Sequence, residues 1–252
     1  MKVISIVNQK GGVSKTTSSV NLAAALAKLN KKVLLIDMDP QSNCTDYAGI
    51  DIEQDTKTTK ELLLSDLHIK NCIVEKENYD CIPTTISLSR SEMEINNKIH
   101  RINLLKNKIK QLNDEYDFVV IDCPPSLGIL MVNALIASTD ILIPINPGMY
   151  AVTGLEDLFQ TIEEVRQENT TLNIKGAFYA MVDKRKNFST QLEEFIKENY
   201  PGLLLKTQIR VCANIDKSQA ARTDIYKYDI ENKTKSRSAE DYIALAKELL
   251  ND

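Results

Sequence analysis

The chain has 252 residues, of which 43% are hydrophobic and 26% charged, a balance typical of a folded globular protein. Its formal net charge of -4 excludes a polycation that coats nucleic acid over its whole surface, so any such binding must come from a local patch. Five cysteines without a Cys-x-x-Cys pair argue against a disulfide framework or a zinc site. Since no apolar run is long enough for a signal peptide or a membrane span, we expect a cytoplasmic protein.

Residues 3–40 carry clear signals for a strand, a helix and a second strand. Residues 3–7 are β-branched and apolar, which predicts a strand. Residues 16–29 place apolar side chains at intervals of three and four, which predicts a helix with one buried face. A second strand, residues 33–36, runs into Asp37-Met38-Asp39-Pro40, where proline ends it.

The middle of the chain carries weaker signals. Thr58 and Glu61 have the spacing of a capping box, which predicts a short helix that reaches Leu64. Residues 79–82 predict a strand. Residues 95–112 are polar with regularly spaced apolar positions, and we expect one surface helix there.

From residue 118 onward strands and helices alternate regularly. Residues 118–121 are apolar throughout, as expected for a strand in the middle of a parallel sheet. The elements predicted after it, in chain order, are helix 128–137, strand 141–145, helix 153–168, strand 174–182, helix 189–198 and helix 238–250. The alternation predicts an α/β fold, namely a doubly wound, mostly parallel sheet with helices on both faces.

A glycine pair marks the turn between the first strand and the first helix. Gly11 and Gly12 allow a tight turn with exposed N–H groups, and together with the helix start these make a cradle for phosphate oxygens. Lys15 is placed to reach the β- and γ-phosphates, and the Thr16 hydroxyl to bind Mg²⁺. A chance Gly-Gly turn is the alternative, but the strand–loop–helix context favours a nucleotide site.

Acidic residues end two other strands. Asp37 and Asp39 follow the second strand, and Asp122 ends the most apolar one. The carboxyl ends of parallel strands meet at one edge of the sheet, where ligands bind. A carboxylate at the end of an apolar strand is costly unless it holds a cation or a hydrogen-bond network. Each aspartate alone could be a turn or capping residue; with the glycine loop, the set predicts a magnesium–nucleotide site.

The loop departs from the common pattern G-x-x-x-x-G-K-[ST], since Gln9 and Ser14 occupy the two glycine positions. The remaining Lys10-Gly11-Gly12-Val13-Ser14-Lys15-Thr16 is similar to the deviant Walker A motif, K-G-G-x-x-K-[ST], of the ParA/MinD family of P-loop ATPases. The segments at Asp37 and Asp122 resemble that family's D-x-D-P-Q and D-x-P-P motifs. Most of the chain resembles short ParA proteins of the Soj type, which implies a single P-loop NTPase domain over residues 1–252.

The resemblance implies roles for these residues and ATP and Mg²⁺ as cofactors. Lys10 would cross a dimer interface to the partner's nucleotide, and Asp39 would position the attacking water, so the catalytic residues are expected to be Lys10, Lys15 and Asp39. The residues expected to bind nucleotide are Lys10, Gly11, Gly12, Val13, Ser14, Lys15, Thr16, Thr17, Asp183 and Arg210, and those expected at the metal are Thr16, Asp37 and Asp122. The family usually has glycine where this chain has Ser14. Serine would strain the loop if that position needs a positive φ.

ParA relatives bind nonspecific DNA as ATP dimers and work with a ParB-like centromere-binding partner, so the resemblance implies an ATP-dependent homodimer with both partners. Residues 184–237 hold twelve basic and seven acidic residues, although half of these charges could simply solvate a surface. Without interleaved aromatic residues, we expect contacts to the DNA backbone alone. The predicted DNA contacts are Lys184, Arg185, Lys186, Lys217, Arg222, Lys227, Lys235 and Arg237. We further expect slow, partner-stimulated ATP hydrolysis and association with the nucleoid in the ATP-bound state.

Four alternatives share the loop. Ser14 favours a nucleotide-gated dimeric adaptor that hardly hydrolyses ATP. A MinD-like membrane ATPase needs a basic amphipathic C-terminus, but residues 247–252 are acidic and polar. An iron–sulfur reductase needs interface cysteines, whereas Cys123 directly follows the predicted metal aspartate. A ligase of the cobyrinate amidase or dethiobiotin type needs a substrate pocket that the sequence does not indicate.

Overall fold

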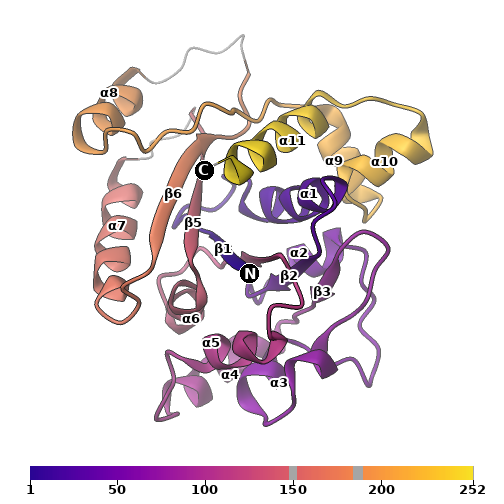
Figure 1. Cartoon of the computed structure of the whole chain (residues 1–252), viewed down its shortest axis with the longest axis vertical. Helices are drawn as coiled ribbons and strands as arrows, with labels where there is room; N and C mark the ends of the chain where they lie inside the picture. The colour runs from indigo at the N-terminus through magenta and orange to yellow at the C-terminus, as the bar shows by residue number, and fades with distance from the viewer. Residues whose placement is uncertain (148–151, 184–189, 252) are drawn as a thin grey trace.

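The computed structural model describes residues 1–147, 152–183 and 190–251 (Figure 1). Its strands, which join in one sheet, are β1 (Lys2–Ile6), β2 (Val33–Asp37), β3 (Asp80–Ile82), β4 (Phe118–Asp122), β5 (Asp140–Ile145) and β6 (Asn173–Tyr179). The strand order is β3-β2-β4-β1-β5-β6, and all neighbouring pairs are parallel. The predicted α/β fold is therefore confirmed. Because β1 lies between β4 and β5, the loop that follows β1 emerges at the middle of the sheet edge.

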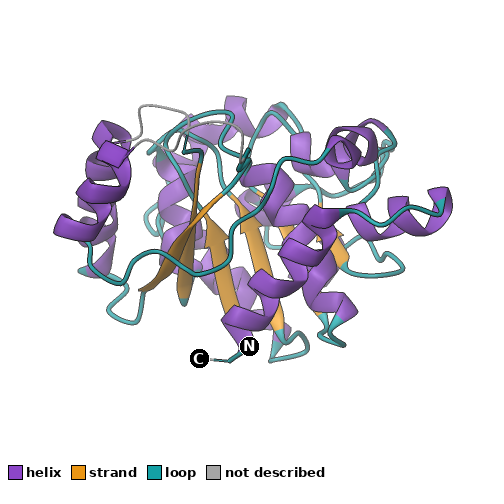
Figure 2. Cartoon of the chain, turned by 90° about the horizontal axis from the view of Figure 1, so that it is seen from above, coloured by secondary structure: helices purple, strands orange, loops and turns teal. Residues whose placement is uncertain are grey.

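Helices cover both faces of this sheet (Figures 1 and 2). They are α1 (Lys15–Lys28), α2 (Asn43–Tyr47), α3 (Thr59–Leu64), η1 (Ile69–Cys72), α4 (Ser87–Asn96), α5 (Leu104–Ile109), η2 (Lys110–Leu112), α6 (Ile129–Ala137), α7 (Val152–Arg166), α8 (Thr190–Asn199), α9 (Ala213–Ala220), α10 (Ile225–Asn232) and α11 (Arg237–Leu250). One hydrophobic core lies between the sheet and α3 to α8, and the other between the sheet and α1, α2, α10 and α11.

Alternating side chains of each strand enter the two cores. In β2, Leu34 and Ile36 belong to the core under α3 to α8, whereas Val33 and Leu35 face α1. This is why the inner strands read as continuous apolar runs rather than as alternating ones.

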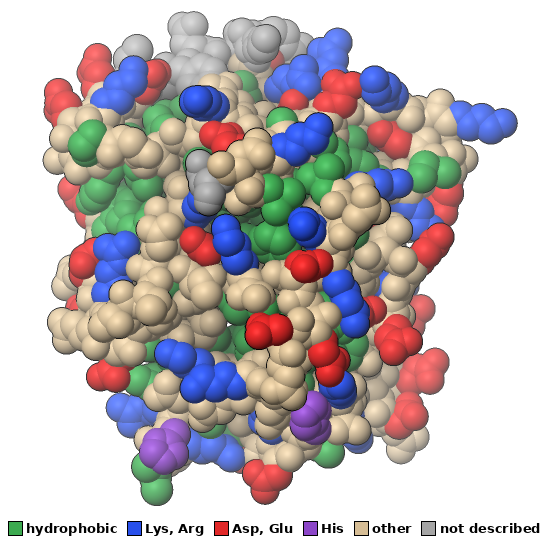
Figure 3. All heavy atoms as spheres, in the orientation of Figure 1, with side chains coloured by type: hydrophobic (Ala, Val, Ile, Leu, Met, Phe, Trp, Pro, Cys, Tyr) green, Lys and Arg blue, Asp and Glu red, His purple; other side chains and the backbone are tan. Residues whose placement is uncertain are grey.

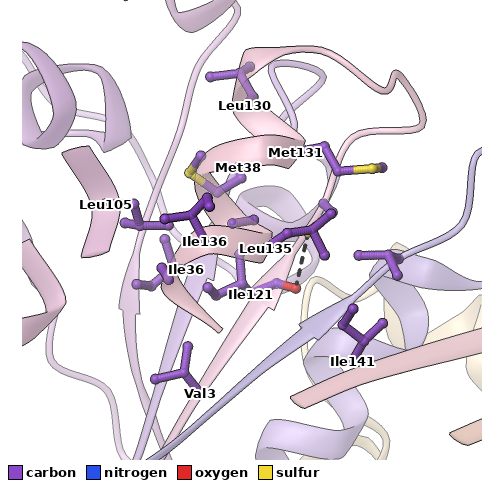
Figure 4. Close-up of a cluster of buried hydrophobic side chains, with 14 of the residues drawn as sticks. Val3, Ile36, Met38, Leu105, Ile121, Leu130, Met131, Leu135, Ile136 and Ile141 are labelled. Atoms are coloured by element: carbon purple, nitrogen blue, oxygen red, sulfur yellow. Dashed lines mark hydrogen bonds between the residues drawn. The ribbon is translucent and has the colours of Figure 1, made fainter. Parts of the chain in front are cut away.

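Figure 4 shows the first of these cores. Ile36 of β2 and Ile121 of β4 lie among Leu105 of α5 and Leu135 and Ile136 of α6, and all five are fully or almost fully buried. Close packing of this kind fixes how the strands end, and so fixes the positions of the residues that follow them.

The prediction of one helix over residues 95–112 is wrong. Helix α4 ends at Asn96, the chain leaves helical conformation, and α5 begins only at Leu104. Asn133 of α6 explains the break, because its amide donates to the backbone oxygen of Arg101 at 2.7 Å and accepts from the backbone nitrogen of Leu105 at 3.3 Å. Ile99, counted as an apolar position of that helix, is 94% exposed.

No helix in the described ranges is both long enough and apolar enough to cross a lipid bilayer.

Candidate functional site

The loop that joins β1 to α1 is anchored to the neighbouring strand. The side-chain amide of Asn8 donates to a backbone oxygen of β5 at 2.8 Å, and its oxygen accepts from the backbone nitrogen of Lys10 at 2.9 Å. Val13 is buried beneath the loop, while Gly11 and Gly12 are exposed. A side-chain carbon added at either glycine would meet nothing within 4 Å, so the space above the loop is open to a ligand.

Two residues of this loop have left-handed backbone conformation. Gly12 has φ 72°, which glycine adopts without steric cost. Ser14, the N-cap of α1, has φ 69° and ψ 29°, and its side chain makes no capping hydrogen bond. For a residue other than glycine this conformation costs roughly 1–2 kcal/mol. The condition under which serine would strain the loop is therefore met.

Lys15 is buried at the start of α1. Its ammonium donates to the backbone oxygen of Lys10 at 2.9 Å, which holds it inside the curve of the loop. Burial lowers the pKa of Lys15, and the nearby carboxylates of Asp122 and Asp39 act against that shift. Because the Lys15 ammonium is buried, an anionic phosphate placed beside it would offset the cost of burying its charge.

Asp122 at the end of β4 joins the loop to the sheet. Its two carboxylate oxygens accept hydrogen bonds from the hydroxyls of Thr16 and Ser19, each at 2.8 Å. Burial raises the pKa of Asp122 to about 6, although the hydroxyl groups and Lys15 oppose this shift. A carboxylate beside a threonine hydroxyl is an oxygen donor set of the kind that Mg²⁺ prefers. Ser19 was not predicted, although it lies one helical turn after Thr16.

Asp37 lies beside Asp122, since the two residues pair in the register of β2 and β4. Its carboxylate accepts from the hydroxyl and the backbone nitrogen of Thr45, at 2.7 and 2.9 Å, and from the backbone nitrogen of Asp39 at 3.0 Å. Burial and the charge of Asp122 raise the pKa of Asp37 to about 8. In this arrangement Asp37 ties α2 to the end of β2.

A cleft of about 550 Å³ opens above the loop. It is lined by Gly11, Gly12, Ser14, Lys15, Thr16, Thr17, Asp39, Gln41, Asn43, Pro125, Met181, Ile209, Arg210, Val211, Cys212, Ile215, Asp216, Gln219 and Tyr242. A volume of this size is typical of small-molecule sites. One end is polar and lies over the phosphate loop, and the other is formed largely by residues 209–215, so the shape suits a ligand with a phosphate tail and an apolar ring.

Asp39 reaches the cleft although its side chain is mostly buried. One carboxylate oxygen accepts from the backbone nitrogen of Gln41 at 3.0 Å, which orients the group at the turn after β2. The predicted catalytic residues Lys15 and Asp39 thus line the same cleft, and Lys10 contributes the backbone oxygen that holds Lys15.

The far end of the cleft differs in detail from the expectation. Arg210 lines it, but its guanidinium is paired with Asp241 through three hydrogen bonds of 2.6 to 3.1 Å. Asp183 is described but is not among the lining residues. Cys212 and Tyr242 line the cleft and were not predicted; no motif marks them, because they come from distant segments that meet only in the fold.

The basic residues predicted to contact DNA fall into three groups: exposed residues, one arginine with a structural role, and residues outside the described ranges. Lys217 of α9 is exposed, and Lys227 of α10 is exposed with Glu77 at 3.7 Å. Lys235 and Arg237 are exposed just before and at the start of α11, and Lys235 pairs with Glu240 at 2.9 Å.

Arg222 has a structural role instead. Its guanidinium pairs with Asp46 at 2.9 Å and Asp51 at 2.7 Å, and it donates to the backbone oxygen of Ile50 at 3.0 Å. These contacts clamp the turn after α9 onto the end of α2, so Arg222 has a structural role, and its predicted contact with DNA stays a prediction. Residues 184–186, the remaining predicted contacts Lys184, Arg185 and Lys186, lie outside the described residues.

Comparison with known proteins places this site in context. Residues 1–174 match the AAA domain family. The chain is 40% identical over 251 residues to the sporulation initiation inhibitor protein Soj of Bacillus subtilis, with 98% of each chain covered. It is 30% identical to the structure of cobyrinic acid a,c-diamide synthase of Mycobacterium smegmatis with a bound ATP analogue and magnesium, at TM-score 0.85, covering 99% of this chain and 94% of that one. It is 32% identical to a plasmid partition protein of Borrelia burgdorferi bound to AMPPNP, at TM-score 0.76, covering 90% and 95%.

Proposed function

The chain belongs to the AAA domain family and is of the ParA/Soj type of partition ATPase, and we propose that it binds and hydrolyses ATP with Mg²⁺ in order to segregate DNA. The observation that carries this proposal is the phosphate loop, where buried Lys15 lines one open cleft together with Thr16, whose hydroxyl donates to Asp122. The whole chain, residues 1–252, acts as one ATPase domain.

The site residues divide the work of phosphoryl transfer. The loop amides around Gly11 and Gly12 and the ammonium of Lys15 neutralise the phosphate oxygens, as positioning and charge neutralisation account for most of this catalysis. Thr16 and Asp122 would hold Mg²⁺, which when bound neutralises charge that develops on the phosphates. Asp39 orients the attacking water. Lys10 reaches the nucleotide of a second copy, which makes the active species an ATP-bound dimer.

DNA binding follows from the basic residues of the C-terminal third. Lys217, Lys227, Lys235 and Arg237 project from α9, α10 and the start of α11, and we assign them to the phosphate backbone of nonspecific duplex. The DNA-bound dimer associates with the nucleoid in the cytoplasm, and a ParB-like protein stimulates its slow hydrolysis. We retain Arg210 and Asp183 as proposed nucleotide contacts near the adenine base.

A nucleotide-gated adaptor is the second candidate, and the backbone of Ser14 favours it. If the strained loop places the γ-phosphate poorly, ATP would bind and promote dimerisation without turnover. A ligase reaction like that of the cobyrinic acid synthase is the third candidate. The identity to Soj is higher, at 40% against 30%, so we place partition first.

Two substitutions test the assignment of the site. Lys15→Ala should abolish ATP binding, because it removes the main counter-charge of the phosphates. Asp39→Ala should keep ATP binding and dimerisation but lose turnover. Calorimetric ATP titration and phosphate release, measured with DNA present, separate the two effects. Near-normal ATP affinity in the Lys15 variant would refute the site, and normal turnover in the Asp39 variant would mean that another group orients the water.

A further inference from the structure

Cys212 differs from the other cysteines of the chain. The thiols of Cys44, Cys72, Cys81 and Cys123 are buried in the two hydrophobic cores, and burial raises the pKa of each of them. Cys212 is only half-buried, and it lines the nucleotide cleft. A thiol reacts as its thiolate and must be accessible, so we expect the four buried cysteines to be inert and Cys212 to be the reactive one.

The surroundings of Cys212 favour a thiolate. The residue is the N-cap of α9, and the N–H groups of the first helical turn point towards this end of the helix. Burial acts to raise the pKa of the Cys212 thiol, but nearby hydrogen-bond donors outweigh it and lower the pKa below its usual value. These donors are the Ser238 hydroxyl, the backbone N–H groups of Asn214 and Ser238, and the Ser236 hydroxyl.

Ser238, in the first turn of α11, has a hydroxyl group without a partner. The side chain is fully buried, and within the described residues its oxygen makes no hydrogen bond. Such a buried polar group is destabilising. It lies beside the Cys212 sulfur, and a negatively charged sulfur would supply the acceptor that this hydroxyl lacks. The pair therefore has the arrangement of a thiolate site rather than that of a structural thiol.

Basic side chains lie around this part of the molecule. Lys217 of α9 and Lys235 and Arg237 at the start of α11 are exposed. Figure 3 shows basic side chains, with acidic ones among them, over α9 to α11. A small disulfide that carries carboxylate groups would be attracted to such a surface.

We propose that Cys212, with Ser238 as its hydrogen-bond donor, is a site of reversible thiol–disulfide exchange with low-molecular-weight disulfides. The Cys212 thiolate attacks one sulfur of the disulfide, so that a new S–S bond joins Cys212 to one half of it as the original S–S bond breaks. The other half leaves as a thiolate and takes up a proton from water. Cys212 is thereby oxidised and the leaving sulfur is reduced, and a free thiol reverses the step.

A mixed disulfide on Cys212 closes the cleft to ATP. Residues 209–215 contribute much of the cleft end that lies away from the phosphate loop, and the attached group fills that end. This part of the proposal rests on the proposed function, in which that end holds the base of the nucleotide. ATP and the disulfide therefore compete: bound nucleotide protects Cys212, and the mixed disulfide excludes nucleotide.

The test treats the reduced full chain with oxidised glutathione and follows the adduct by intact-protein and peptide mass spectrometry. One glutathione should attach, on Cys212, about tenfold faster or more than on any of the buried cysteines. Saturating ATP with Mg²⁺ should slow the attachment about tenfold, and dithiothreitol should remove the adduct. Equal labelling of all five cysteines, or no adduct on Cys212, would overturn the proposal.

ATP affinity, measured by calorimetry before and after the treatment, tests the closing of the cleft. The adduct should weaken ATP binding about tenfold or more, and dithiothreitol should restore it. Cys212→Ser should show the same ATP affinity before and after treatment. The matched control, Cys212→Ser with Thr170→Cys, carries an exposed thiol in the turn before β6, at the opposite edge of the sheet, and its adduct should leave ATP affinity unchanged.

Ser238→Ala isolates the hydrogen-bond donor. Because the described residues give this hydroxyl no partner, its removal should cost little stability, while attachment of glutathione should slow several-fold. An unchanged rate would refute the role of Ser238.

The remaining outcomes separate the two parts of the proposal. An adduct on Cys212 that leaves ATP affinity unchanged, or an equal loss of affinity in the Thr170 control, would refute the closing of the cleft. If the reduced protein binds no ATP at all, the proposed function fails, while selective attachment at Cys212 still supports exchange there.

Discussion

The pair Asp37 and Asp122 brings two buried carboxyl groups together at the ends of adjacent strands. Thr16, Ser19 and Thr45 donate hydroxyl hydrogen bonds to them, yet burial still raises both pKa values. Such an arrangement lowers stability in the absence of a cation and is typical of functional sites, where strain is tolerated for binding.

Replacement of Asp122 should therefore stabilise the protein when no ligand is present. The folded-state pKa of about 6 exceeds the ordinary value of 3.8, so the folded protein binds this proton more tightly and loses stability as pH rises between these values. Asp122→Asn removes that loss, and we expect a gain on the order of 1–3 kcal/mol near neutral pH that disappears as pH falls towards 4.

Thermal unfolding of both proteins across this pH range, without magnesium or nucleotide, measures the effect. Asp66→Asn is the matched control, because Asp66 is exposed. A variant that is less stable than the original at neutral pH would contradict the account of Asp122 as a buried, unfavourably charged group.

Ser14 offers a second test at this scale. Ser14→Gly should speed ATP turnover, because glycine adopts φ 69° without strain and lets the loop close on the phosphates. Asn30→Gly is the control: Asn30 also has a positive φ, of 60°, but lies beyond the end of α1. Phosphate release under saturating ATP is the measurement. An unchanged or lower rate for the Ser14 variant would reject strain as a brake on catalysis.

At the scale of elements, a buried polar network joins α1 to α2 and α9. Tyr47 of α2 accepts from the amide of Asn21 at 3.0 Å and shares a 2.8 Å hydrogen bond with the hydroxyl of Ser218. Asn21 also donates to the backbone oxygen of Thr17 and accepts from the backbone nitrogen of Ile225. The helix that starts at the phosphate loop is thus connected to the helices that carry Lys217 and Lys227.

Tyr47→Phe should lower the free energy of unfolding by about 1–3 kcal/mol, because it leaves buried groups of Asn21 and Ser218 with fewer partners. Urea denaturation measures the change. Tyr228→Phe, at a partly exposed position on α10, should change it by less than about 0.5 kcal/mol. Equal effects of the two substitutions would mean that the network contributes little to stability.

Prediction from the sequence succeeded where local signals and burial agree. The strand ending at Asp122 and the capping box of α3, in which Thr58 and Glu61 bond reciprocally, follow from residues close in sequence. The break after α4 did not, because it depends on Asn133, a residue some thirty positions away. Likewise, the glycine loop was evident, but the clamp of Arg222 on Asp46 and Asp51 is a long-range contact that composition cannot reveal.

At the scale of the whole molecule, charge is distributed unevenly. Helices α7 and α8 carry seven acidic and two basic residues, whereas Lys217 of α9 and Lys235 and Arg237 near the start of α11 are exposed basic residues, and Figure 1 shows the two groups of helices on opposite sides of the sheet. Under the proposed function, a protein with net charge -4 must therefore bind the DNA backbone through a local patch, in a defined orientation.

The most direct test of the proposed partition function is binding to a random-sequence DNA duplex without nucleotide, with ADP and with ATP, over a range of salt. We predict strong binding only with ATP, and an affinity that falls steeply with salt because lysine and arginine displace counterions from the phosphates. Absence of binding in every state, or binding that ignores the nucleotide, would contradict an ATP-dependent DNA partition function for this chain.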